Sequence, residues 1–126
     1  MAQRQHIRDA VKRELGKLYL GEIFTTRQPD LTDLDEAVVV VLVSGEVEDG
    51  EGLDASTVAD LELHFYAREK TDGELDDWAA ELASALAIEK VSDVVQGIFP
   101  GDWEYTADES GQFSGLVIHY SIMYSD

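Results

Sequence analysis

The chain has 126 residues, no cysteine, 27 acidic against nine basic residues, and a formal net charge of −18. The length is that of one domain, so we expect residues 1–126 to form a single domain, and the lack of cysteine excludes disulfides and thiolate metal sites. The charge argues against a nucleic-acid-binding surface, because it repels phosphates, and the hydrophobic content of 44% argues against a disordered acidic chain.

The basic residues are concentrated near the N-terminus. Residues 1–27 contain six basic and three acidic residues, whereas residues 28–126 contain three basic and 24 acidic residues. Charges occur throughout the first 17 residues, with no apolar segment like that of a signal peptide, so we expect a product that stays in the cytoplasm. The longest apolar run, at 37–43, is too short to span a bilayer, and we expect no membrane partner.

Residues 4–18 are predicted to form a helix, because apolar residues recur there at helical spacing. The residues of this apolar stripe are Ile7, Ala10, Val11, Leu15 and Leu18. Three strands are predicted next, at 21–27, 37–43 and 56–68. The strand at 37–43 has no polar face, so we expect it to be a central strand, covered on both sides at least in the assembled state. The strand at 56–68 alternates between apolar and polar residues, which predicts one buried and one open face.

Residues 70–90 form the clearest predicted helix. Thr71 and Glu74 have the spacing of a capping box, in which the hydroxyl accepts from a first-turn amide and the carboxylate accepts from the amide of the cap. Its apolar stripe, which includes Trp78, is predicted to be buried. A short helix is predicted at 92–98, ended by Pro100 and Gly101.

The C-terminal part is predicted to be a hairpin of strands at 103–108 and 113–125. The predicted order is therefore α-β-β-β-α-α-β-β. This order indicates an α+β fold, with helices packed on one face of a mostly antiparallel or mixed β-sheet.

An acidic, glycine-containing loop is predicted at 46–54, between two strands. Its carboxylates are Glu46, Glu48, Asp49, Glu51 and Asp54. The loop superficially resembles a calcium-binding EF-hand loop, but its flanks are strands and the ligand spacing fails. We therefore expect no cofactor, and at most a weak effect of divalent cations on this loop.

No catalytic or metal-binding motif is found. His6, His64 and His119 fall on a predicted helix and two different strands, and no two of them have metal-ligand spacing on one element. His64 and His119 could be neighbours across the sheet. Adjacent acids such as Asp76 and Asp77 are expected in so acidic a chain. We therefore predict no catalytic residues, no metal site and no enzymatic activity.

The ordered set of segments along the chain resembles the minor tail protein U family, the tail-terminator proteins of phages with long non-contractile tails. The resemblance rests on HIRDAV at 6–11, FTTRQP at 24–29, ADLELHF at 59–65, GELDDW at 73–78, WEYTADESGQF at 103–113 and LVIHYSIMY at 116–124. It covers essentially the whole chain.

The resemblance implies a structural virion protein, assembled in the host cytoplasm and located in the virion tail. Six copies would form a homohexameric ring on the last ring of the tail tube, stop tube growth and present the surface that joins the head. The implied partners are other copies of the chain, the tail tube protein and the head–tail joining protein, and DNA would pass through the ring without specific binding.

Two hypotheses connect the charge to this role. The acidic loop is predicted to line the ring opening or to contact the next tail component, because an acidic lining does not hold DNA phosphates. The bases of the first helix, Arg4, Arg8, Lys12 and Arg13, are candidates for the subunit interface, since ring contacts join two different patches. A solvated helix face is the alternative for these four. The alternative function is a monomeric acidic binding module that mimics DNA.

Overall fold

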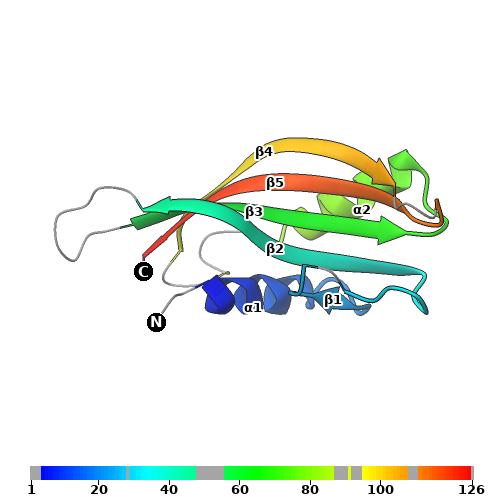
Figure 1. The fold of residues 1–126 in the computed structure, drawn as a ribbon, viewed down its shortest axis with the longest axis horizontal. Helices are drawn as coiled ribbons and strands as arrows, with labels where there is room; N and C mark the ends of the chain where they lie inside the picture. The colour runs from blue at the N-terminus through cyan, green and yellow to red at the C-terminus, as the bar shows by residue number, and fades with distance from the viewer. Residues whose placement is uncertain are drawn as a thin grey trace.

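The computed structural model describes residues 4–27, 29–47, 56–86, 91, 95–107 and 111–125. Two helices and five strands occur in these residues. In chain order they are α1 (Arg4–Leu15), β1 (Ile23–Phe24), β2 (Glu36–Val47), β3 (Ser56–Ala67), α2 (Asp72–Ala83), β4 (Val95–Ala107) and β5 (Ser114–Ser125). The strands form one sheet in the order β1-β2-β3-β5-β4, in which only the β1–β2 pair is parallel (Figure 1). The α+β prediction is confirmed.

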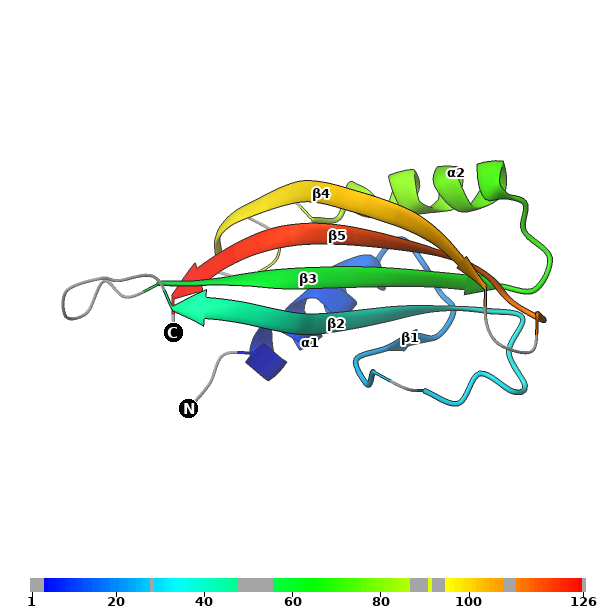
Figure 2. The ribbon, with the colours of Figure 1, turned by 45° about the horizontal axis from the view of Figure 1, so that its top comes forward.

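Both helices cover the same face of the sheet. A single apolar core joins residues of α1, such as Val11, and of α2, such as Leu82, to the inward side chains of β3, among them Leu63 and Phe65. The helix α1 contacts β2, and α2 contacts β5 and β3, so that the two helices cover opposite halves of the face (Figures 1 and 2). Tyr19 connects the two halves, because its ring packs against that of Trp78 with the centroids 5.3 Å apart.

The alternation of β3 decides which side chains are buried. Leu61, Leu63 and Phe65 are completely buried beneath the helices, whereas Asp60, Glu62 and His64 are only half-buried on the opposite face. We call this opposite face of β3, β5 and β4 the open face. The expectation for 37–43 is confirmed for residues 37–41, which are buried on both faces of β2 between β1 and β3, and is wrong for Val43, which is 49% exposed.

The predicted helix at 92–98 is wrong for residues 95–98, which belong to β4; residues 92–94 lie outside the described residues. A short apolar run such as this fits either a strand or a buried helix turn, and pairing with β5 decided in favour of the strand. Pro100 and Gly101 do not end the element. They lie at an irregularity of β4 between Pro100 and Trp103, where an edge strand tolerates a residue without a backbone N–H.

The helices are shorter than predicted. The first ends at Leu15, and Leu18 lies beyond it with 45% of its surface exposed. The second ends at Ala83 and begins with the predicted capping box: the Glu74 amide donates to Thr71 Oγ1 at 3.2 Å, and the Thr71 amide donates to Glu74 Oε1 at 3.1 Å. Among the described residues, no helix has both the length and the apolar character needed to cross a membrane.

Candidate functional site

Most of the predicted acidic loop falls outside the described residues, namely Glu48, Asp49, Glu51 and Asp54. The backbone of Glu46 belongs to a strand and not to the predicted loop. It is part of β2, which continues to Val47, and it pairs with Val58 of β3. The two strands therefore continue further toward their connection than the run of apolar residues at 37–43 indicated.

Two of the four predicted interface bases, Arg4 and Arg8, meet at the edge of the sheet. Together with Arg27 and Thr25 they line a hollow of about 420 Å³ beside residues 41–43 of β2. We call this the basic hollow. The first two arginines project from the same side of α1, one helical turn apart, because side chains four positions apart share a helix face. The third was not predicted, since only the pairing of β1 with β2 places it there.

Among the described residues, the arginines of the basic hollow have no acidic partner. Within the described ranges, no carboxylate oxygen lies within 4.0 Å of a guanidinium nitrogen of Arg4, Arg8 or Arg27. Arg8 instead donates to the side-chain oxygen of Gln5, at 2.7 Å from Nη2. Positive charge is therefore left uncompensated at this edge of a very acidic chain, and it can bind an anionic group from outside the subunit.

The other two predicted interface bases do not line the hollow. Lys12 is exposed on α1. Arg13 is directed into its own subunit, where Nη2 donates to the carbonyl of Val91 at 3.3 Å and Nε lies 3.9 Å from the buried carboxylate of Glu14. The structure therefore separates the four bases into a pair at the sheet edge, one exposed lysine and one arginine with intramolecular partners.

The opposite half of the subunit is acidic. Helix α2 contains five carboxylates and no base, and β4, the edge strand beside it, adds Asp102 and Glu104 and no base. The hydroxyl of Tyr105 donates to both carboxylate oxygens of Asp76, at 2.7 and 2.8 Å. The pKa of Tyr105 is raised to about 12, mainly by this hydrogen bond to a carboxylate and to a smaller extent by desolvation. The contact fixes α2 to the strand at the edge of the sheet.

An apolar groove runs between α2 and β4, with a volume of about 410 Å³. We call it the α2–β4 groove. Its floor and walls include Ala80, Ala83, Trp103 and Tyr105. The indole of Trp103 is 60% exposed and its ring packs edge-on against that of Tyr105, with the centroids 5.3 Å apart. Exposed aromatic side chains over an apolar groove are typical of a protein-binding surface.

The subunit therefore has two different surfaces at opposite ends of one sheet. The strands β1 and β2 lie at one edge of the sheet, and β4 with α2 lies at the other (Figure 2). The basic hollow is beside β2, and the apolar groove is between α2 and β4. The uneven charge of the two parts of the sequence gave the sign of each surface. Trp103 and Tyr105 were not predicted as functional, although they are alternate residues of a predicted strand, because only the position of β4 at the edge leaves them exposed.

A model of the family described as phage minor tail protein U matches residues 2–124 of the chain. A search of curated proteins gave no match. Among solved structures, a chain of the virion of a native gene transfer agent particle is similar in fold. The two chains share 15% sequence identity, the similarity covers 94% of each chain, and the TM-score is 0.68. At this identity, the similarity establishes a common fold.

Proposed function

The chain belongs to the phage minor tail protein U family and is a structural protein of a phage tail; from this premise we propose that it forms a hexameric ring on the end of the tail tube. The ring stops polymerisation of the tube and presents the surface to which the head is joined. Its direct partners are neighbouring copies, the tube protein and the head–tail joining protein.

The observation that carries this proposal is the presence of two complementary surfaces on one subunit. A closed ring needs a heterologous contact, in which one patch of each copy meets a different patch of the next. The arginines of the basic hollow and Asp76, the α2 carboxylate that lines the α2–β4 groove, belong to two such patches, which lie at opposite edges of the sheet. The apolar α2–β4 groove supplies the desolvated part that a stable contact requires.

Charge reversal on each side tests the contact between neighbours. Arg8→Glu and Asp76→Lys each place like charges opposite one another and are expected to abolish ring formation, measured by light scattering and by negative-stain images of concentrated protein. The double variant Arg8→Glu/Asp76→Lys restores opposite charges and is expected to regain rings. Asp77→Lys is the matched control, because this residue is on the same helix but does not line the groove.

The result that would contradict the ring is a wild-type chain that stays monomeric under every ionic condition and does not bind tube ends. That outcome would favour the monomeric acidic binding module instead. The role as terminator has its own test: the protein is added to extracts that lack a terminator, and tails of uniform length are the expected result.

The acidic segment between β2 and β3 has a separate part in the proposal. Its carboxylates line the ring opening, or contact the next tail component, and keep DNA phosphates from binding during passage. Changing Glu46, Glu48, Asp49 and Glu51 to serine together is expected to impair tail assembly or DNA ejection. Normal assembly and ejection in this variant would exclude the segment from that role while leaving the ring itself untouched.

A further inference from the structure

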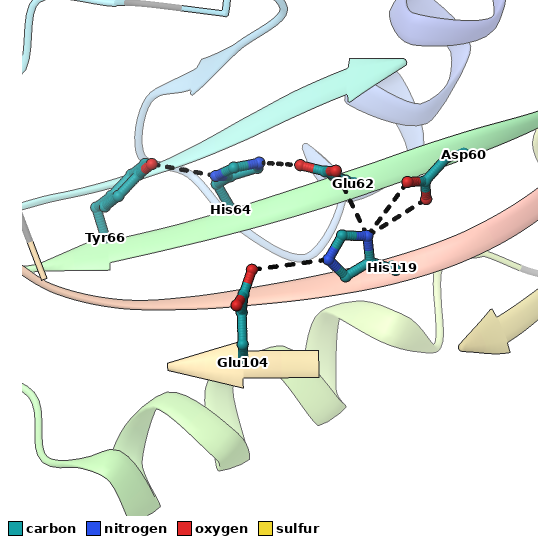
Figure 3. A network of polar contacts seen from close by, with 6 residues as sticks. All are labelled: Asp60, Glu62, His64, Tyr66, Glu104 and His119. Carbon is teal, nitrogen blue, oxygen red and sulfur yellow. Dashed lines mark hydrogen bonds and ion pairs between the residues drawn. The ribbon is translucent and has the colours of Figure 1, made fainter. Parts of the chain in front are cut away.

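The open face carries a cluster of three side chains that the sequence keeps far apart. Asp60 and Glu62 of β3 and His119 of β5 each have an oxygen or nitrogen within 4.8 Å of the others' (Figure 3). Pairing of β3 with β5 places Glu62 directly opposite His119. All three side chains are half-buried, with 15% to 36% of the side-chain surface exposed. We propose that this cluster binds a zinc-class divalent transition-metal ion, a site independent of the ring contact described above.

Two of the three distances between donor atoms match those of neighbouring ligands of a tetrahedral ion, although they are long for a charge-assisted hydrogen bond. His119 Nδ1 lies 3.3 Å from Asp60 Oδ2 and 3.4 Å from Glu62 Oε2. A charge-assisted hydrogen bond between nitrogen and oxygen is shorter, at about 2.7–2.9 Å. Zinc bonds of about 2.0–2.1 Å with tetrahedral angles place neighbouring donors about 3.3–3.4 Å apart. An ion between the three groups could therefore keep His119 at its present distances from Asp60 and Glu62.

A neighbouring side chain holds one of the three ligands in place. His64 Nε2 donates to Glu62 Oε1 at 2.7 Å, and its Nδ1 lies 3.1 Å from the hydroxyl of Tyr66. This chain fixes one oxygen of Glu62 and leaves the other, Oε2, directed at His119 (Figure 3). On the far side of the imidazole, Nε2 of His119 lies 4.0 Å from Glu104 Oε1. Metal sites commonly have outer partners that, like His64 here, orient a ligating carboxylate.

Charge and access also favour a cation. Within the described part of the chain, no lysine or arginine nitrogen lies within 4.0 Å of Asp60, Glu62 or Glu104. Asp60 and His119 also line a hollow of about 660 Å³ on the open face, together with Ser121. This hollow gives an ion and water access to Asp60 and His119. The imidazole nitrogen selects zinc and related ions over magnesium, which prefers six oxygen ligands.

The experiment is a zinc titration by calorimetry, made in excess magnesium so that unspecific carboxylate sites are occupied. The wild type is expected to bind one zinc per chain and, with cobalt in place of zinc, to give the visible absorption bands of tetrahedral cobalt. His119→Gln and Asp60→Asn are each expected to weaken zinc binding by about 100-fold or more. Glu104→Gln, which removes an exposed negative charge 4.0 Å from the imidazole, is expected to weaken it by a smaller factor. The double variant Asp77→Asn/His6→Gln makes the same charge and histidine changes away from the cluster and is expected to bind zinc like the wild type.

Equal zinc binding by the wild type and the Asp60→Asn/His119→Gln variant would overturn the proposal, and so would displacement of zinc by millimolar magnesium. One measurement needs no variant and therefore does not depend on whether a substituted chain folds. Nitrogen-15 spectra of the histidine rings of the wild type are expected to show a shift of His119 Nδ1 on addition of one equivalent of zinc, with His6 unchanged. A shift of His6 alone, or of neither ring, would contradict the site.

Discussion

The helices α1 and α2 perform the same structural task with opposite surfaces. Each has 12 residues and buries one apolar stripe against the same face of the sheet. The outer side of α1 carries the bases Arg4, Arg8 and Lys12, whereas α2 carries five carboxylates and no base. Packing against the sheet therefore requires apolar residues only on the inner side of each helix. The sign of the outer charge is free to serve assembly, and in this chain it differs between the two ends of the subunit.

The comparison is tested most strongly in the core. Leu15→Ala in α1 and Leu82→Ala in α2 each remove a completely or nearly completely buried side chain. Each is expected to lower the free energy of unfolding by about 2–5 kcal/mol, measured by urea denaturation, because a cavity adds to the lost burial. If one of the two variants lost less than about 1 kcal/mol, the helix that carries it would contribute less to the core than the other helix does.

The cap of α2 is expected to give the next largest effect. Thr71→Ala removes the hydroxyl that accepts from the Glu74 amide, and a loss of about 1 kcal/mol is expected in the same urea experiment. Ser84→Ala, at the other end of the helix, is the control. Its exposed hydroxyl donates to a carbonyl one turn back, and a smaller loss is expected. Equal losses would mean that the capping box adds nothing specific.

The same cap predicts a dependence on pH. The pKa of Glu74 lies below its ordinary value of 4.5 because Glu74 forms hydrogen bonds with Thr71. The larger contribution comes from the backbone of Thr71 and the smaller one from its side chain. Because the folded-state pKa is the lower one, this stabilisation is fully present above the unfolded-state pKa and is lost as the pH falls through the folded-state pKa. Melting temperatures of the wild type and Glu74→Gln are therefore expected to differ near neutral pH and to converge in acid. A constant difference would contradict the assignment.

The smallest effect on stability is expected on the outer sides of the helices. Arg8→Glu and Asp77→Lys change exposed or half-exposed charges away from the core. The free energy of unfolding of each monomer is expected to stay within about 0.5 kcal/mol of the wild type. A large loss in either variant would show that outer charge contributes to the fold, and the separation of packing from charge would fail.

The sequence alone determined much of the architecture. Periodicity identified α1, the core of α2, β3 and the C-terminal hairpin, because burial of one face leaves a repeat of 3.6 or 2 residues. The capping box of Thr71 and Glu74 was predicted because it is formed within one turn. The uneven charge of the N-terminal and C-terminal parts was equally visible. The strand at 95–98 was not predicted, because its short apolar run fits both a strand and a buried turn of helix. Only the pairing with β5 distinguishes the two.

The tertiary structure decided which distant residues meet. Arg27 joins Arg4 and Arg8 only because β1 pairs with β2, and Trp103 is exposed only because β4 is the edge of the sheet. Glu62 and His119 are opposite one another only in the register of β3 with β5. Periodicity reports whether a side chain is buried, whereas a binding site depends on which strands are neighbours. Strand order and register arise from the packing of the whole chain, and no local pattern encodes them.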